Sequence, residues 1–324
     1  MSKAIRIFEN GGPEVMQFVD VDVPPPASGE IMLRHESIGL NFIDVYFRTG
    51  LYKQSLPAGL GMEAAGVVEA VGDGVEHLSV GDRVAYACPP PGAYAERRTM
   101  PADNVLKLPD TVDFDTAAAV MLKGLTVQYL FRQTFPLKGG ETILFHAAAG
   151  GVGLVACQWA RALGVTMIGT VGSDEKAALA REHGCAHTIN YKTENIVERV
   201  KEMTDGKGVP VVYDSVGNDT FYNSLDCLAP LGMMVSFGSA SGPVPAFNLN
   251  ELASRGSLFI TRPTLFSYAR TRGQLEQMSA DLFEMLGSGK VAPIISGHYA
   301  LSDVASAHAD LERRATTGSI LLKP

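Results

Sequence analysis

The spacing of apolar and polar residues along the chain changes near Lys123. Before that point the chain alternates apolar and polar residues in short runs, separated by turn-forming segments such as GGPEV, PPPASGE and CPPPGAY. After it, short buried apolar runs alternate with longer amphipathic segments. The pattern therefore predicts an all-β, barrel-like N-terminal region followed by an α/β region.

The α/β region is predicted to contain strands with helices between them. We expect strands at residues 142–145, 165–170, 188–190, 209–213, 233–237 and 258–261. Helices are expected at residues 151–163, 174–182, 196–203 and 220–228. Strands that alternate with helices in this way indicate a doubly wound parallel sheet of the Rossmann type.

The C-terminal segment holds too few elements to form a domain of its own. It is predicted to contain a helix at 272–286, a strand at 297–301, a helix from Ser302 and a strand at 319–322. We expect this segment to return to the N-terminal barrel, with the α/β domain inserted between the two parts. The predicted domains are residues 1–123 with 267–324, and residues 124–266. A length of 324 residues agrees with two domains.

Composition narrows the classes of function. The chain has 27 Lys and Arg against 35 Asp and Glu, a net charge of −8, which argues against broad binding to nucleic acid or to anionic membranes. Its four cysteines include no C-x-x-C pair, so neither a disulfide framework nor a zinc knuckle is predicted. The start, MSKAIRIFEN, lacks the apolar core of a signal peptide, and the longest apolar run, 147–157, is too short to span a bilayer. We expect a cytoplasmic protein.

The segment LFHAAAGGVGL lies between a predicted strand and a predicted helix. It contains Ala148-x-Gly150-x-x-Gly153, the spacing of a dinucleotide-binding loop with alanine in place of the first glycine. Gly150 lets the backbone approach a pyrophosphate, Gly153 lets the helix pack closely on the sheet, and the helix N-terminus attracts phosphates. Alanine is tolerated at position 148 if its φ angle is negative. We predict a nucleotide site; the alternative is a tight strand–helix turn without a ligand.

The end of the next strand distinguishes NAD from NADP. NAD-binding proteins usually place an Asp or Glu there to bind the ribose 2′-OH, but this chain has Gly172. Ser173 and Lys176 can bind a 2′-phosphate, and Tyr191 after the third strand can donate its phenol O–H. The acidic pair 174–175 is expected to stabilise the first turn of the following helix. The predicted cofactor is NADPH.

The chain resembles the medium-chain dehydrogenases/reductases, typified by zinc alcohol dehydrogenases. The resemblance rests on GLGMEAAGVVEAVGDGVEHLSVGDRV, AAAGGVGLVACQWARALG and YDSVG. In the zinc enzymes a Cys and a His in the segments that match IGLNFIDVY and GMEAAGVV bind the catalytic metal, whereas this chain has Asn41 and Met62. The cysteine-rich lobe for structural zinc is missing too, and no two histidines lie at ligand spacing on a shared element. No metal is predicted.

A narrower resemblance follows from LNFIDVYFRTGLY, LKGLTVQYL, FHAAAGGVGL, VYDSVG, MVSFG and TRPTL, which are similar to the zeta-crystallin-type NADPH:quinone oxidoreductases. It implies an α/β fold in which a GroES-like β-barrel catalytic domain is joined to a Rossmann NADPH-binding domain. Without a Lewis acid the acceptor must take up hydride readily, as quinones and conjugated carbonyls do. Residue types do not distinguish one-electron from two-electron transfer, or solvent from a phenol as the proton source.

The resemblance also implies that the acceptor pocket is lined by Asn41, Asp44, Tyr46 and Tyr52. An amide and phenols donate hydrogen bonds to a developing oxyanion without a permanent charge, and tyrosine rings can stack on a planar acceptor. Asp44 is expected to orient a neighbour rather than to transfer a proton. The alternative is that the two tyrosines are ordinary loop aromatics.

The remaining candidates are implied to bind the cofactor, although Lys123 and Thr126 could instead be part of an ordinary helix start. The last candidate, Arg314, is open by one position because Arg313 lies beside it. The candidates are Lys123 and Thr126 at the nicotinamide ribose; Gly150, Gly151 and Val152 at the pyrophosphate; Gly172, Ser173, Lys176 and Tyr191 at the 2′-phosphate; Ser215 at the adenosine; Phe237, Gly238 and Ser239 at the nicotinamide half; Arg262 and Pro263 at the carboxamide; and Arg314 at a phosphate.

Two other functions stay open. A 2-alkenal or enone reductase would share the fold and cofactor and differ in its acceptor. A non-catalytic crystallin-like or RNA-binding protein is the alternative from another class, and the negative charge and the lack of a basic, aromatic-rich stripe weigh against RNA. The strand expected at 258–261 is predicted to be an exposed sheet edge. The resemblance implies that such edges pair across a two-fold axis, so we expect a homodimer.

Overall fold

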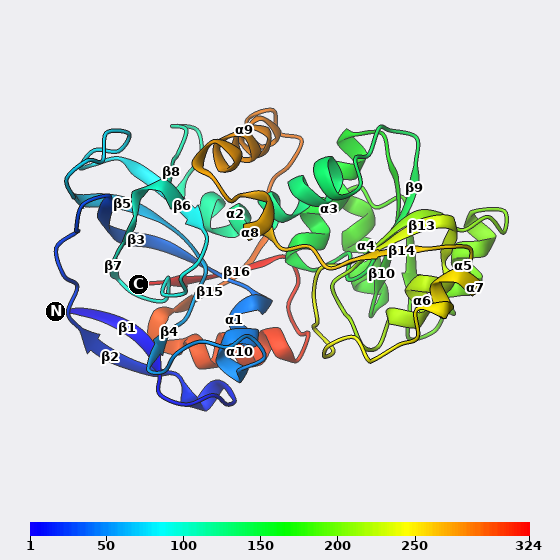
Figure 1. The fold of residues 1–324 in the computed structure, drawn as a ribbon, viewed down its shortest axis with the longest axis horizontal. Helices are drawn as coiled ribbons and strands as arrows, with labels where there is room; N and C mark the ends of the chain where they lie inside the picture. The colour runs from blue at the N-terminus through cyan, green and yellow to red at the C-terminus, as the bar shows by residue number, and fades with distance from the viewer. The chain divides into compact units, whose positions relative to one another are not determined.

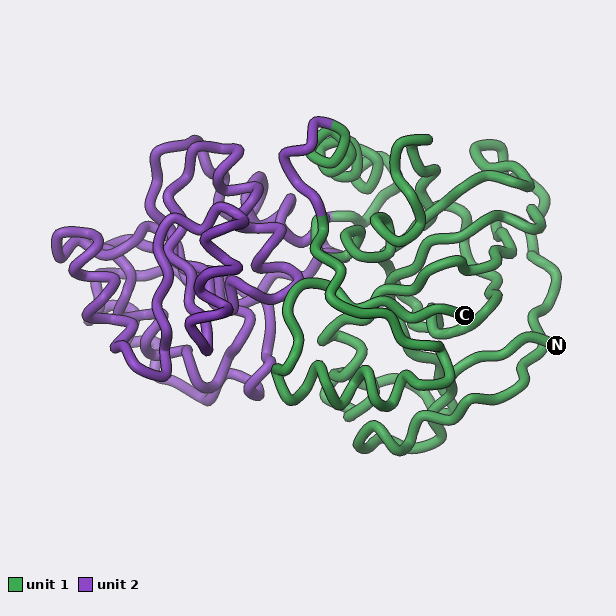
Figure 2. Tube along the Cα trace, turned by 180° about the vertical axis from the view of Figure 1, so that it is seen from behind, with its two compact units in different colours: residues 1–125, 269–287, 293–324 green, residues 126–268, 288–292 purple.

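The computed structural model describes residues 1–324 (Figure 1). The chain forms two compact units, coloured separately in Figure 2. Unit 1 consists of Met1–Leu125, Ala269–Gly287 and Pro293–Pro324, and unit 2 consists of Thr126–Tyr268 and Ser288–Ala292. The first boundary falls inside helix α2 (Phe114–Tyr129).

Unit 1 contains a seven-stranded sheet and a three-stranded sheet. Strand β16 pairs antiparallel with β3, with Leu321 opposite Gly39, so the C-terminal segment is part of the same sheet as the N-terminal one. The larger sheet has the order β15 (Ile295–Ala300), β16 (Ser319–Lys323), β3 (Glu30–Leu40), β5 (Glu63–Val71), β6 (Arg83–Ala87) and β8 (Leu106–Lys107), with β7 (Arg97–Pro101) also paired to β3. The smaller has the order β2 (Gln17–Val21), β1 (Ser2–Ile7) and β4 (Ala58–Gly59).

Three helices besides α2 belong to unit 1. Helix α1 directly follows β3, and a left-handed glycine, Gly50, ends it at a φ of 81°. Such a C-terminal glycine is a common helix stop because it adopts positive φ without strain. The helices are α1 (Phe42–Thr49), α9 (Arg272–Gly287) and α10 (Val304–Glu312), and short 3₁₀ turns lie at Pro13–Val15, Ala102–Asn104 and Leu301–Asp303.

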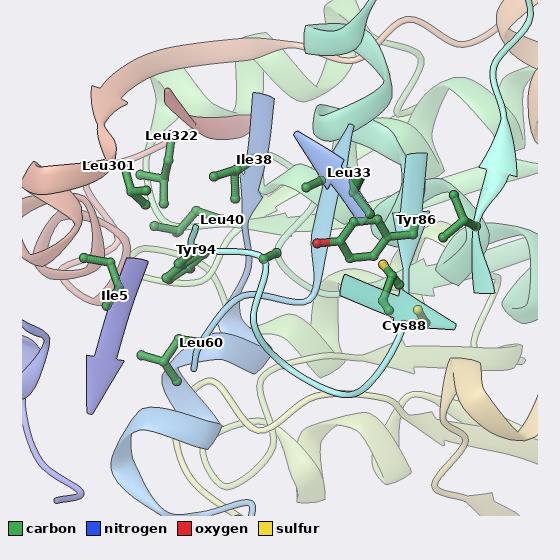
Figure 3. Packing of buried hydrophobic residues seen from close by; sticks show 14 of the residues in the cluster. Ile5, Leu33, Ile38, Leu40, Leu60, Tyr86, Cys88, Tyr94, Leu301 and Leu322 are labelled. Carbon is green, nitrogen blue, oxygen red and sulfur yellow. The ribbon is translucent and has the colours of Figure 1, made fainter. Parts of the chain in front are cut away.

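The core of unit 1 is formed by the inward faces of its strands (Figure 3). Alternate residues of β3 are buried as far as Ser37, as expected for a strand with one face on the core. The rings of Tyr86 and Tyr94 lie among aliphatic side chains in this core (Figure 3). A buried phenol needs a hydrogen-bond partner, and the Tyr86 hydroxyl lies 2.9 Å from Nε2 of His35.

Unit 2 is built on a six-stranded parallel sheet with the order β11-β10-β9-β12-β13-β14. The order reverses between β9 and β12, which is the point where open α/β sheets bind ligands at the carboxyl ends of their strands. The predicted doubly wound sheet is confirmed. Its strands are β9 (Thr142–Phe145), β10 (Thr166–Val171), β11 (His187–Asn190), β12 (Val209–Asp214), β13 (Leu228–Ser236) and β14 (Phe259–Thr261).

All but the last helix of unit 2 connect successive strands of this sheet, and the last one follows β14 (Figure 1). A π-helical turn, Leu130–Thr134, follows α2 directly. The helices are α3 (Gly151–Ala162), α4 (Asp174–Glu182), α5 (Ile196–Met203), α6 (Phe221–Asp226), α7 (Asn250–Ser254) and α8 (Leu265–Tyr268).

Some boundaries differ from those predicted. Strand β13 begins at Leu228 rather than at Met233, and α6 is correspondingly short. The segment Pro230–Gly232 has the composition of a turn, and the register of β13 against β12 shifts between Val209 and Val211, so this irregular start of the strand is not visible as an alternating pattern. Lys123 lies inside helix α2, so its interpretation as a helix start is wrong.

No helix of the chain combines the length and the apolar character that crossing a membrane requires.

Candidate active site

The glycine loop of unit 2 joins β9 to α3. Its left-handed residue is Ala147, with a φ of 57°, whereas Ala148 keeps a negative φ. The condition under which alanine is tolerated at position 148 is therefore met. The Ala148 amide donates to the Thr170 carbonyl of β10 at 3.0 Å, which ties the loop to the neighbouring strand.

Close packing requires glycine at position 153. A Cβ atom there would lie 2.3 Å from the carbonyl oxygen of Ala147 and 2.5 Å from that of Ala148, and both are backbone atoms that cannot move aside. Gly150 precedes the first residue of α3, and Gly151 and Val152 form the first turn of this helix. The first amides of a helix have no acceptor within it, so they point toward any ligand at the N-terminus.

The four candidates for a 2′-phosphate lie together where β10 and β11 end. Val171 is paired with Asn190, so the residues that follow each strand are neighbours. A Cβ atom on Gly172 would lie 2.5 Å from the Tyr191 hydroxyl, which shows that this phenol lies directly over the glycine. Lys176 is half-buried in the first turn of α4, and Tyr191 is 41% exposed.

Ser173 has a structural task that the sequence did not indicate. Its hydroxyl oxygen accepts a hydrogen bond from the Lys176 amide at 3.3 Å and so caps helix α4. A hydrogen bond with Ser173 also lowers the pKa of Glu175. Asp174 accepts a bond from Nδ2 of Asn190 at 2.9 Å, which connects the start of α4 to β11. Both acidic residues lie in the first turn of α4, the position in which the expected stabilising role places them, and they have different partners.

The candidate for the adenosine follows β12, and those for the nicotinamide half and the carboxamide follow β13 and β14. A Cβ atom on Gly238 would lie 2.4 Å from the Ser215 carbonyl oxygen, so the loops after β12 and β13 are in direct contact. Arg262 donates to the Ser236 carbonyl at 2.9 Å and to the Ser239 hydroxyl at 3.3 Å. The ring of Phe237 packs on Phe145, Pro263 is buried, and Thr126 is half-buried on α2.

In unit 1, Asn41 and Lys123 converge on a residue that sequence reasoning missed. Glu63 is fully buried, and its Oε2 accepts from Nδ2 of Asn41 at 2.7 Å and from Nζ of Lys123 at 3.2 Å. Its Oε1 accepts from the Leu122 amide at 2.6 Å. A buried charge needs such partners, so Glu63 neutralises Lys123 and orients the amide of Asn41. A carboxylate directly after Met62, inside an otherwise apolar segment, was the available signal.

Asp44 is the third residue of α1 and is fully buried. Its Oδ2 accepts from the backbone amide of Asn41 and from the Tyr94 hydroxyl, each at 2.9 Å. Its Oδ1 is buried without a partner. Burial raises the pKa of Asp44 to about 7, against the lowering effect of the hydrogen bonds from Tyr94 and Asn41. These contacts suit the orienting role expected for Asp44.

A chain of buried groups continues from Tyr94. Its hydroxyl donates to Asp44 and therefore accepts from Nε2 of His308, 3.0 Å away. Nδ1 of His308 then accepts from Arg48, also at 3.0 Å, and Arg48 binds both carboxylate oxygens of Glu312 at 2.8 Å. Burial lowers the pKa of His308 to about 3, so the ring is neutral. The chain ties α1 to α10, and none of its members beyond Asp44 was predicted.

The two candidate tyrosines differ in their exposure. Tyr46 is buried on α1, at 8% exposure, and its ring packs edge-on against Tyr52 with centroids 5.3 Å apart. Tyr52 is half-buried just after the helix, and its amide donates to the Tyr46 carbonyl at 3.0 Å. Tyr46 is therefore not a loop aromatic. Arg314, at a φ of 57°, follows α10 in unit 1, whereas most of the other cofactor candidates are in unit 2.

Donors for a metal ion do not gather in either unit. No three His, Cys, Asp or Glu side chains lie close enough together to hold a metal ion. Asn41 and Met62, at the positions where zinc enzymes carry ligands, are both buried.

Two family models match the two parts of the fold. Residues 27–110 match the alcohol dehydrogenase GroES-like domain, and residues 151–283 match the model described as zinc-binding dehydrogenase. The GroES-like part and the Rossmann-type sheet together define a medium-chain dehydrogenase/reductase, so the expected fold class is confirmed.

Full-length relatives place the chain in one family of this superfamily. The chain is 56% identical to a quinone oxidoreductase of Pseudomonas aeruginosa, with 100% of both chains covered. The crystal structure of Escherichia coli quinone oxidoreductase complexed with NADPH matches with a TM-score of 0.98 at 51% identity, covering 99% of this chain and 100% of that one. A 2-haloacrylate reductase of a Burkholderia species is 45% identical, covering 100% of this chain and 99% of its own. The chain belongs to the quinone oxidoreductase family, which confirms the resemblance seen in the sequence.

The buried carboxyl group of Asp44 makes stability depend on pH. Because burial raises its pKa from 3.8 to about 7, the folded state holds this proton more tightly than the unfolded state. Asp44 therefore costs no stability at low pH, destabilises the fold increasingly as pH rises from about 4 to about 7, and adds no further loss above that range. We predict that Asp44→Asn, which keeps an acceptor oxygen, gains stability relative to the native chain over this range, by on the order of a few kcal/mol.

Melting temperatures of the two proteins, measured between acidic and mildly alkaline pH, check this prediction. The difference in melting temperature in favour of Asp44→Asn should widen up to about neutral pH and then level off. Asp22→Asn, at an exposed carboxylate, should give a gap that does not change with pH. Parallel curves for Asp44→Asn and the native chain would contradict the assignment.

Proposed function

We propose that the protein reduces quinones with NADPH, without a metal ion. One observation carries the cofactor part of this proposal. Where β10 ends, the chain has Gly172 under the hydroxyl of Tyr191, beside the half-buried Lys176. A phenol and an ammonium suit a 2′-phosphate, and no carboxylate occupies the position that binds the 2′-OH in NAD-binding proteins.

The glycine loop fits the pyrophosphate of such a cofactor. A side chain at position 153 would collide with the loop backbone, and Gly150 leaves the approach to the helix N-terminus open. The amides of Gly151 and Val152 would bind the pyrophosphate, assisted by the positive end of α3. When bound, NADPH supplies a hydride to the acceptor.

The other cofactor contacts belong to the same proposal. Ser173 would join Lys176 and Tyr191 at the 2′-phosphate, provided that its hydroxyl proton turns from Glu175 to the ligand. Residues that follow the remaining strands would bind the nucleoside parts, because the carboxyl edge of a doubly wound sheet is where such ligands lie. These residues are Ser215 at the adenosine; Phe237, Gly238 and Ser239 at the nicotinamide half; Arg262 and Pro263 at the carboxamide; Lys123 and Thr126 at the nicotinamide ribose; and Arg314 at a phosphate.

The acceptor would be bound by Asn41 with the rings of Tyr46 and Tyr52. Nδ2 of Asn41 carries two hydrogens, so one can bind Glu63 while the other is donated to the oxygen that gains charge. Because Glu63 already pairs with Lys123, it holds the amide without adding an uncompensated charge. Asp44 would act as a positioning residue, since its Oδ2 binds the backbone of Asn41.

Rates of NADPH oxidation with different acceptors test the proposed reaction. We predict that kcat/KM for 1,4-benzoquinone or 9,10-phenanthrenequinone exceeds that for a simple enone by at least about tenfold. The second candidate function is reduction of an activated carbon–carbon double bond, which is favoured by the relative that is named a 2-haloacrylate reductase. Turnover of 2-chloroacrylate or an enone without turnover of quinones would support that function and contradict the first.

The 2′-phosphate site can be tested separately from the acceptor. We predict that Lys176→Glu raises the KM for NADPH by about tenfold or more, because it replaces an attraction to the 2′-phosphate by a repulsion. The KM for NADH should change by less than about twofold. Lys201→Glu, on the exposed side of α5, is the matched control and should change neither value. An unchanged preference for NADPH in Lys176→Glu would show that the phosphate binds elsewhere.

We also propose that two copies of the chain pair through β14, in the reducing environment of the cytoplasm. Strand β14 is an edge of the six-stranded sheet, and Phe259 on it is 55% exposed. All four cysteines are free and buried, which suits a reducing compartment.

The proposed dimer predicts a change in mass on substitution at this edge. Phe259→Lys should convert a dimer to a monomer in size-exclusion chromatography with light scattering, because the charge would be buried in the pair. Leu249→Lys, at a residue that is 70% exposed outside β14, should leave the mass unchanged. A monomeric native chain would refute the proposed pairing.

A further inference from the structure

A chain of hydrogen bonds crosses the carboxyl edge of the unit 2 sheet beneath the glycine loop. The Ala147 amide lies 3.3 Å from Oγ1 of Thr170, which lies 3.0 Å from Nδ1 of His146. Nε2 of His146 lies 3.0 Å from Oγ of Ser224, which donates to Oδ2 of Asp214 at 2.7 Å. The side chains of Thr170, His146, Ser224 and Asp214 are all buried. None of them is among the predicted site residues.

The donors and acceptors of this chain have one consistent direction. Ser224 gives its proton to the carboxylate of Asp214, so its oxygen accepts from His146 and the ring proton is on Nε2. Nδ1 is then an acceptor and takes the hydroxyl proton of Thr170, whose oxygen accepts from the Ala147 amide. Every group is satisfied only while the imidazole is neutral. Burial lowers the pKa of His146 although Asp214 raises it, which keeps the ring neutral.

Each end of the chain holds one loop of the proposed nucleotide site. At one end is Ala147, whose φ of 57° is strained for a residue with a Cβ atom. At the other end, Oδ1 of Asp214 accepts from the amides of Val216 and Gly217 at 2.8 and 3.0 Å. The chain therefore connects the loop after β9 with the loop after β12, which carries Ser215, across the point where the strand order reverses.

We propose that His146, Thr170 and Ser224 are positioning residues for the nucleotide, which hold the strained glycine loop and the Ser215 loop in one fixed arrangement. Because they are buried, they act through the backbone that they hold and not by contact with the ligand. Preorganisation lowers the conformational cost of binding, so the chain contributes to affinity for the cofactor and not to binding of the acceptor. This inference rests on the proposed binding of NADPH by unit 2.

Matched variants at Thr170 separate the hydroxyl from the shape of the side chain. Thr170→Val keeps the branched shape and removes the link between Ala147 and His146, whereas Thr170→Ser keeps the hydroxyl. In isothermal titration with NADPH, Thr170→Val should raise the Kd by about tenfold and Thr170→Ser by less than about threefold. The KM for the quinone at saturating NADPH should stay unchanged in both.

A second break in the chain provides an independent measurement. Ser224→Ala should also raise the Kd for NADPH by about tenfold. Ser236→Ala is its control, because the Ser236 hydroxyl is buried on β13 without a hydrogen-bond partner, and it should leave the Kd unchanged. Thr170→Val combined with Ser224→Ala should be little worse than either alone, because both interrupt the same chain.

The outcomes distinguish this inference from the proposed function. If the native chain binds NADPH and both Thr170→Val and Ser224→Ala bind it equally well, the positioning role is wrong while the proposed function stands. Effects on the Kd that multiply in the double variant would also refute the chain as one unit. If the native chain does not bind NADPH, both the function and this inference fail. If Thr170→Val does not fold, the positioning role is decided by comparing the Kd for NADPH of Ser224→Ala with that of Ser236→Ala.

Discussion

The structure of unit 2 depends on hydrogen-bond partners for the polar groups that are buried at the carboxyl ends of β9, β10 and β12. Three strands and their loops meet there, and backbone amides that are buried at such an edge need acceptors from the protein. Oδ1 of Asp214 binds two amides, and Thr170 binds a third through its hydroxyl. His146 and Ser224 join these two acceptors into one chain. The loop geometry at this edge therefore follows from side chains inside the unit and not from the loops alone.

In unit 1, the buried groups that need partners are charged. Glu63, Lys123 and Asn41 form a buried cluster in which the carboxylate accepts three hydrogen bonds. Breaking such a cluster leaves an uncompensated charge, so its members are expected to act together. Asp44 is different, because one of its oxygens is buried without a partner and its pKa is raised by burial. Two carboxyl groups therefore hold the start of α1. Glu63 is neutralised by Lys123, and Asp44 has a raised pKa and readily takes up a proton.

The family assignment gives these clusters their chemical meaning. Zinc-containing members of the superfamily use a metal to polarise the substrate, and this chain has an amide and a thioether at the matching positions. An acceptor that delocalises charge needs hydrogen-bond donors more than it needs a Lewis acid. Asn41 with one amide hydrogen bound to Glu63 suits that requirement. In the proposed site, the buried carboxylate of Glu63 would orient the amide that binds the acceptor.

The sequence by itself determined the succession of strands and helices along the α/β region, the position of the glycine loop and the family, because hydrophobic period and glycine spacing are local signals. It also located the residues that follow β10 and β11, since parallel strands end at the same edge. The tertiary structure alone decided the partners of Glu63 and the chain from Ala147 to Asp214. Those contacts join residues such as His146 and Ser224, which are 78 positions apart, and each partner by itself is an ordinary polar residue. The irregular start of β13 was likewise decided by pairing with β12, because no alternating pattern marks it.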